Sequence, residues 1–147
     1  MSVRLSGPPR RARGLSRRRL LAHARALLAA LGQADAELSL ALVDDATGAE
    51  LNRRFRGRAG ATDVLSFALL EGAHTQHRGA LLGDVVIALG VARRQADAHG
   101  LTLEAECLRL LIHGVLHLLG YDHARAEEAR VMRTLERRLW RGLGDRR

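Results

Sequence analysis

The chain has 147 residues, which is near the usual size of one domain and long enough to bury a sizeable core. Its hydrophobic fraction of 47% favours a globular fold, and its aromatic fraction of 3% indicates a core of small aliphatic side chains. Its net charge of +8 comes from 24 basic residues, all arginine, against 16 acidic ones, and no apolar run reaches the ~18 residues that a membrane span needs.

Residues 1–14 contain Pro8, Pro9 and several arginines. This composition predicts a flexible basic arm, with at most a short strand at Val3–Leu5. Residues 15–147 then form a single domain. Apolar periodicity and capping residues predict helices at 16–31, 46–55, 91–99, 102–119 and 126–141, and alternating or continuous apolar runs predict strands at 37–43, 64–69 and 81–89. The fold class that this order predicts is α+β, with a small sheet covered by helices.

Three histidines lie within eleven residues, in the stretch HGVLHLLGYDH from His113 to His123. His113 and His117 are four residues apart on a predicted helix, so both imidazoles lie on one face, one turn apart. Gly120 then ends the helix, and the turn allows His123 to return to the same point. Three imidazoles leave one tetrahedral position open, which is the arrangement of a catalytic zinc site, so one Zn²⁺ per chain is expected.

The spacing H-x-x-x-H-x-x-G-x-x-H is also that of the metal ligands in metzincin proteases. Those enzymes carry a glutamate directly after the first histidine, as the base that activates water. Gly114 occupies that position here, so the chain lacks a peptidase base of this type. A glycine costs about 1 kcal/mol relative to alanine inside a helix, and close approach of another segment or room for a large substrate would explain it.

The stretch HGVLHLLGYDH resembles the signature of the YbeY family of bacterial endoribonucleases. Two upstream blocks resemble further parts of the family pattern, LNRRFRGRAGATDVLSF at 51–67 and LLGDVVI at 81–87. Glu128, Met132 and Glu136 in the last predicted helix also fit it. The resemblance covers roughly residues 38–144, with Ala68 standing where the family usually has proline.

The resemblance implies a metal-dependent, single-strand-directed endoribonuclease that acts in 16S ribosomal RNA 3′-end maturation and in ribosome quality control. It also implies zinc held by His113, His117 and His123 in a zincin-like site on a helix, and a mixed sheet of about four strands. The family's cleft arginine falls on Arg56. RNA is the implied substrate, small-subunit components and an assembly GTPase are plausible partners, and no membrane partner is expected for a cytoplasmic protein.

Two catalytic roles follow as hypotheses. Arg56 would stabilise the negative charge that develops on the scissile phosphate, although as one of 24 arginines it also fits a solvated surface charge. Asp84 and Asp122 are candidates for the general base, and either could instead orient a ligand imidazole. The arginines of the arm and the arginines at positions 53, 54, 56 and 58 would contact RNA phosphates, and these contacts would weaken as salt rises.

Two other functional classes remain open. One is a metalloprotease with an unusual base, which the histidine spacing suggests and Gly114 opposes. The other is a ribosome-associated zinc protein that cleaves nothing. Incubating the metal-loaded protein with single-stranded RNA and with casein would distinguish the three classes.

Overall fold

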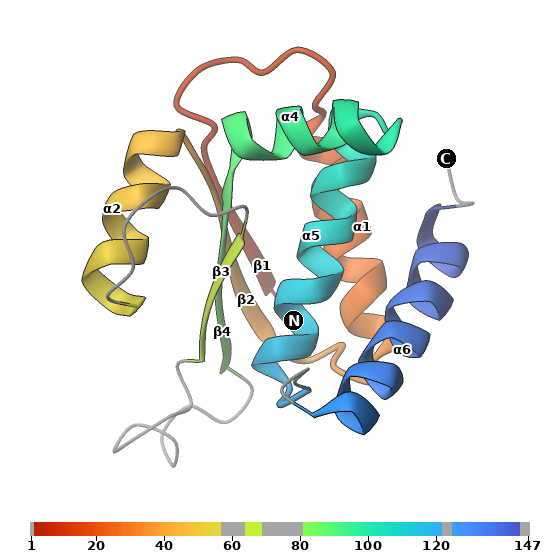
Figure 1. Ribbon diagram of the computed structural model, residues 1–147. Helices are drawn as coiled ribbons and strands as arrows, with labels where there is room; N and C mark the ends of the chain where they lie inside the picture. The colour runs from red at the N-terminus through yellow and green to blue at the C-terminus, as the bar shows by residue number, and fades with distance from the viewer. Residues whose placement is uncertain (1, 57–63, 69–80, 122–124, 145–147) are drawn as a thin grey trace.

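The computed structural model describes residues 2–56, 64–68, 81–121 and 125–144. One sheet is covered on one face by α1 and α5, with α6 packed on these two helices, while α2 lies against the other face and α4 lies across one end (Figure 1). In chain order the elements are β1 (Ser2–Ser6), α1 (Arg17–Ala30), β2 (Glu37–Val43), α2 (Asp45–Arg56), β3 (Val64–Ala68), β4 (Leu81–Ala88), α4 (Leu89–His99), α5 (Leu103–Leu118) and α6 (Ala126–Gly144).

This order confirms the α+β class, and the predicted helices and strands agree with the structure to within a few residues at each end. The strands of the described residues lie in the order β1-β2-β4-β3. β1, β2 and β4 are parallel, and β3 runs antiparallel to β4. Because α5 packs against both β3 and β4, the helix that carries the histidines rests on this half of the sheet.

β1 includes the short strand expected at Val3–Leu5 within residues 1–14 and extends it by one residue at each end. Ser2–Ser6 pairs with β2 in parallel register, with Leu5 opposite Leu40. Val3 and Leu5 pack against the core, and the guanidinium of Arg17 donates to the carbonyl of Leu5 at 3.0 Å. The alternation of apolar side chains over only five residues was too short to separate a strand from an arm in the sequence.

The core lies between the sheet and the helices α1, α5 and α6. The leucines of β2 alternate as predicted, with Leu38, Leu40 and Leu42 buried. α5 is the most deeply buried helix, and its Leu111 and Val115 have no exposed surface. No helix of the described residues combines the length and apolar character that crossing a membrane requires.

Side-chain caps fix the ends of the helices. Ser16 and Thr102 accept hydrogen bonds from backbone amides in the first turns of α1 and α5, as their sequence positions predict. α4 has no cap of its own at Ala88. Instead Asp45, the first residue of α2, accepts from the amide of Val91 at 3.0 Å and so joins the starts of α2 and α4.

Candidate metal centre

α5 brings two of the three predicted ligands together at its C-terminal end. The Nε2 atoms of His113 and His117 are 3.1 Å apart. Their rings are nearly perpendicular, at 76°, with centroids separated by 4.6 Å. The His113 side chain retains 30% of its exposure, so the pair is accessible from solvent. Helical spacing alone therefore aims both Nε2 atoms at one point, as the sequence predicts.

The separation of these two nitrogens is close to that required by a shared metal ion. Tetrahedral zinc with Zn–N bonds of roughly 2.0–2.1 Å places two nitrogen ligands about 3.3 Å apart. The observed 3.1 Å needs only a small adjustment of either ring to reach that value. The donor set of imidazole nitrogens also suits zinc. On both counts the histidine pair fits the ion that the sequence predicts.

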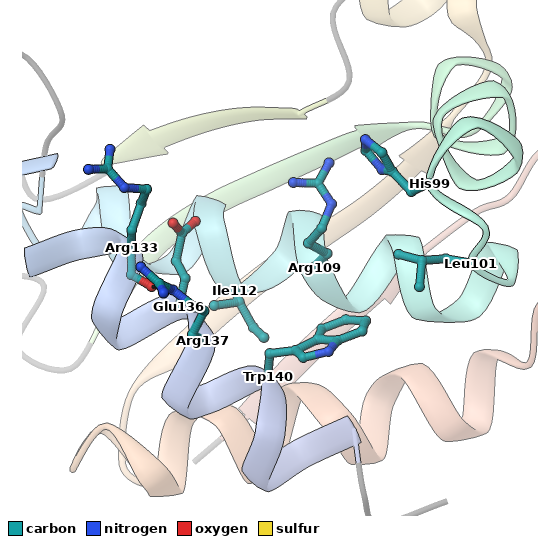
Figure 2. Close-up of a pocket in the computed structure, with 8 residues that line it drawn as sticks. All are labelled: His99, Leu101, Arg109, Ile112, Arg133, Glu136, Arg137 and Trp140. Atoms are coloured by element: carbon teal, nitrogen blue, oxygen red, sulfur yellow. Dashed lines mark hydrogen bonds between the residues drawn. The ribbon is translucent and has the colours of Figure 1, made fainter. Parts of the chain in front are cut away.

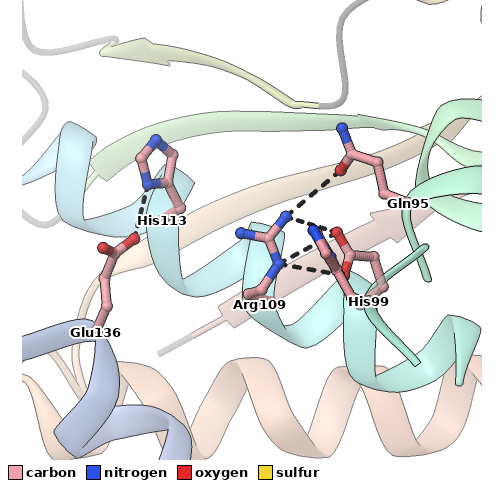
Figure 3. A network of polar contacts seen from close by, with 6 residues as sticks. Gln95, His99, Arg109, His113 and Glu136 are labelled. Atoms are coloured by element: carbon pink, nitrogen blue, oxygen red, sulfur yellow. Dashed lines mark hydrogen bonds and ion pairs between the residues drawn. The ribbon is translucent and has the colours of Figure 1, made fainter. Parts of the chain in front are cut away.

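Glu136 fixes the orientation of His113. Its Oε2 lies 2.7 Å from His113 Nδ1 (Figure 3). A neutral imidazole that donates its Nδ1–H to this carboxylate keeps the lone pair on Nε2, which is the atom facing His117. A carboxylate behind a histidine ligand is a common feature of metal sites, and it makes the ligand more basic.

The sequence predicts no role for Glu136 beyond its fit to the family pattern. A signal for it exists in α6. Glu136 lies four residues after the buried Met132 and three before the buried Leu139, so a carboxylate stands on the apolar face of an amphipathic helix. Its partner could not be predicted, because the contact depends on how α6 packs against α5.

Of the other predicted site residues, only Asp84 has a side chain that the structure describes. His123 lies outside the described residues, as does Asp122, and so does the side chain of Arg56, the last residue of α2. Within the described ranges no group of three or more metal-binding side chains is placed to hold an ion. Asp84 is half-buried in β4, opposite Ser39 and Phe67, and in the part of the chain described no hydrogen bond or ion pair joins it to the histidine pair.

Gly114 has a structural reason for being glycine. A Cβ atom at this position would lie 3.0 and 3.2 Å from the two methyl groups of Val85 and 3.4 Å from a methyl group of Val64. The absent side chain therefore allows α5 to approach the sheet closely. The position where metzincins carry their catalytic glutamate faces packed valines here, so close approach accounts for the glycine.

Cys107 is excluded as a nucleophile. Its side chain has no exposed surface. Burial, together with the negative charges of Glu106 and Glu104, raises the pKa of the Cys107 thiol to about 12. Because the thiolate is the reactive form, this cysteine is a core residue.

A second polar cluster joins Glu106 and Arg109, which lie one to two turns before His113 on α5, to Gln95 and His99 of α4. The carboxylate of Glu106 is fully buried and accepts from the guanidinium of Arg109 at 2.6 Å. It also lies 3.1 Å from Nδ1 of His99, and Arg109 contacts Gln95 at 3.4 Å (Figure 3). Burial alone would raise the pKa of Glu106, but its bonds to Arg109 and His99 prevail and hold that pKa below its usual value of 4.5.

A family model described as Endoribonuclease YbeY matches residues 13–144. This chain belongs to that family. The match extends the resemblance noted in the sequence from residue 38 back to residue 13, so it includes α1.

Individual YbeY proteins are similar over most of this chain. An Endoribonuclease YbeY of Anaeromyxobacter sp. (strain Fw109-5) is 51% identical over 144 residues, which cover 98% of this chain and 73% of that protein. That of Anaeromyxobacter dehalogenans (strain 2CP-C) is 53% identical over 127 residues, 86% of this chain and 64% of that protein. The chain thus spans about two thirds to three quarters of the length of these two relatives.

A solved structure has the same fold. The solution structure of a Thermotoga maritima protein superposes with a TM-score of 0.65 at 27% sequence identity. The superposition covers 97% of this chain and 89% of that protein.

Proposed function

We propose that this YbeY-family chain is a metal-dependent endoribonuclease that cleaves single-stranded RNA in the maturation of the 16S ribosomal RNA 3′ end and in ribosome quality control. The observation that carries the proposal is the pair of Nε2 atoms 3.1 Å apart, one of them on a histidine oriented by Glu136. Relatives about 50% identical to this chain are named as endoribonucleases. A histidine pair with the spacing for a shared metal ion, on a protein of net charge +8, supports such an activity.

His113 and His117, with His123 as the third ligand by spacing, would hold one zinc ion. When bound, the ion would supply Lewis-acid chemistry, polarising the phosphodiester and making water more acidic. The protein contributes the orientation of both rings. Because Glu136 accepts the Nδ1–H of His113, that ring is held with its Nε2 lone pair toward the ion.

Arg56 is proposed to neutralise the negative charge that builds up on the phosphate during cleavage. It is the last residue of α2, and the seven residues 57–63 separate it from β3 in the sequence. Asp84 is proposed as the general base, and its contribution is tested separately from that of Arg56.

A protease built on this site would need its base at a position other than 114. Val85 and Val64 occupy the space beside Gly114, where a metzincin carries its glutamate. Because the family model and the relatives of this chain are described as endoribonucleases, we expect no casein hydrolysis.

The deciding experiment compares the wild-type protein with His113→Ala/His117→Ala. Zinc content is measured by elemental analysis, and cleavage of a single-stranded RNA is measured on a gel. We expect the wild type to hold about one zinc and to cleave RNA, and the double variant to lose both. A wild type that holds zinc but cleaves neither RNA nor casein would instead identify a non-catalytic zinc protein. RNA cleavage that survives in the double variant would mean a contaminating ribonuclease.

Single variants then separate metal binding from chemistry. Arg56→Ala should lower RNA cleavage at least tenfold with zinc content unchanged, whereas Arg19→Ala, whose exposed side chain pairs with Glu104 away from the proposed RNA contacts, should cleave normally. Asp84→Asn should lower cleavage with zinc content unchanged. Normal cleavage by either Arg56→Ala or Asp84→Asn would remove that residue from the mechanism.

The proposed cellular partners follow from the substrate. Precursor ribosomal RNA and small-subunit components are met in the cytoplasm, where an assembly GTPase would act on the same particle. Co-purification of the tagged protein with small-subunit precursors tests this part of the proposal.

A further inference from the structure

A cavity of about 510 Å³ opens beside the metal centre, between α5, α6 and the turn that joins α4 to α5. α6 contributes Arg133, Glu136, Arg137 and Trp140 to its wall, and Arg109 of α5 lies across from them (Figure 2). Its volume is within the range of about 300–1,000 Å³ typical of small-ligand sites.

The cavity is continuous with the metal centre through shared residues. Glu136 lines it and also bonds to Nδ1 of His113. A second hollow of about 280 Å³ is lined by His113 itself, together with Arg133 and Glu136. A chain of nucleotides lying in the larger cavity would therefore have its next phosphates close to the histidine pair.

Three arginines line the cavity, and two of them, Arg133 and Arg137, are available for a ligand. The third, Arg109, is bonded to the buried Glu106 and to Gln95. Arg137 donates its Nε–H to the carbonyl of Arg133 in its own helix. Within the described residues neither Arg133 nor Arg137 has an acidic side chain at ion-pair distance. Like charges four residues apart repel one another in a helix, so a ligand that carries negative charge would relieve the repulsion.

Trp140 supplies the apolar part of the wall. It is the only tryptophan in the chain, it is half-buried, and it packs on the core. Arg133, Arg137 and Trp140 follow one another at helical spacings of four and three residues, so they share one face of α6. An aromatic ring beside guanidinium groups that have no acidic partner among the described residues is the combination that binds unpaired nucleotides, whose bases stack and whose phosphates need cations.

We propose that this cavity binds a nucleotide flanking the cleavage position in single-stranded RNA, with its base stacked on Trp140 and its phosphates contacted by Arg133 and Arg137. The inference rests on the proposed function, because it extends the same site. It also gives a physical reason for single-strand preference, since a base paired in a duplex cannot leave its stack to lie on the indole.

Trp140 itself reports binding. The metal-loaded full chain is titrated with a 2′-O-methyl RNA decamer, verified intact on a gel after each titration. Tryptophan fluorescence and the anisotropy of a dye on the RNA are recorded together. We expect quenching of Trp140 that saturates with the anisotropy change. Poly-glutamate at equal charge should leave the fluorescence unchanged, and equal quenching by that peptide would overturn the assignment to RNA.

Charge variants test the two arginines. Arg133→Gln/Arg137→Gln should weaken RNA binding about tenfold or more at low salt. It should also reduce the slope of log K against log salt by about 1.4, since each phosphate contact to a single strand contributes about 0.7. The matched control Arg138→Gln/Arg141→Gln removes the same charge from exposed positions that do not line the cavity, and should change affinity less than twofold. Equal effects of the two pairs would overturn the proposal.

Trp140→Leu tests stacking separately, by anisotropy. It should weaken binding at every salt concentration while leaving the salt slope unchanged, and wild-type affinity would contradict the stacking role. If this variant is destabilised in thermal unfolding, Trp140→Met replaces it, and the two arginine pairs still decide the matter because their side chains are exposed.

Zinc content and RNA cleavage distinguish the two proposals. If the wild type cleaves RNA and the cavity variants bind RNA as tightly as the control pair, the cavity assignment fails and the proposed function stands. If the wild type holds zinc yet neither binds nor cleaves RNA, both fail.

Discussion

Glu136 contacts His113, a predicted zinc ligand, but is not itself a predicted ligand. A substitution at Glu136 therefore changes the orientation of the His113 ring and leaves the set of predicted ligands intact. Replacing its carboxylate with an amide in Glu136→Gln weakens the acceptor for the Nδ1–H of His113 without removing a zinc ligand. We expect zinc affinity to fall about 10–100-fold, as for other carboxylates behind histidine ligands. Competition with a chromogenic chelator measures the change.

The matched control is Glu128→Gln, which removes the same charge from a half-exposed position on the same helix. It should bind zinc like the wild type. Equal zinc affinity of Glu136→Gln and the wild type would contradict the orienting role of Glu136.

Glu106 makes the stability of the fold depend on acid pH. Its pKa in the folded state lies below 4.5, so the charged carboxylate stabilises the fold above pH 4.5, and this contribution is lost as the pH falls through the folded-state pKa. Glu106→Gln should cost about 2 kcal/mol of unfolding free energy at pH 7, because it loses charge-assisted hydrogen bonds to Arg109.

Urea unfolding at pH 7 and pH 3.5 checks this. The wild type should lose more stability between the two pH values than Glu106→Gln does, since the variant lacks the titrating group. A parallel pH dependence for both proteins would mean that Glu106 is not charged in the folded state.

The roles of some residues can be predicted from the sequence, and those of others cannot. His113 and His117 are predicted because helical spacing alone decides which face they share. Glu136 and Arg109 are not, because their roles depend on side chains of other helices. The leucines that follow Cys107 in the sequence favour a core position for it, and its side chain is buried in the structure.

At the scale of elements, Gly114 sets how closely α5 lies on the sheet. Gly114→Ala gains helix propensity of about 1 kcal/mol but forces a Cβ against both methyl groups of Val85. Overpacking of this kind costs about 1–3 kcal/mol, so we expect a net destabilisation of about 1 kcal/mol in urea unfolding.

The control for this prediction is Gly142→Ala, at a helical position with no atom within 4 Å of the added carbon. It should stabilise the protein by up to about 1 kcal/mol. In a Val85→Ala background Gly114→Ala should no longer destabilise, and an unchanged penalty there would place the clash elsewhere.

Helices and long strands are predictable here because each carries its own periodicity and caps. Ser16, Thr102 and Gly100 mark helix ends in the sequence, and the structure confirms each of them. The cap of α4 is the exception. Asp45 reaches it from a helix 46 residues away along the chain, and no local pattern carries that information.

At the scale of the whole molecule, the α+β class follows from the order of elements, but the arrangement of the sheet does not. Nothing local predicts that β4 lies between β2 and β3, or that β3 alone is antiparallel. The cavity beside the histidine pair is also unpredictable from sequence, since its walls come from α5, α6 and the end of α4.

The position of β1 has a practical consequence for anyone producing this protein. β1 is the outermost strand on its side and satisfies the backbone hydrogen bonds along one flank of β2. A shortened version beginning after Ser6 would leave the amide and carbonyl groups of β2 uncovered, and an uncovered strand is a template for association with other copies. Purification tags and protease-cleavage scars therefore belong at the C-terminus, where they leave this flank intact.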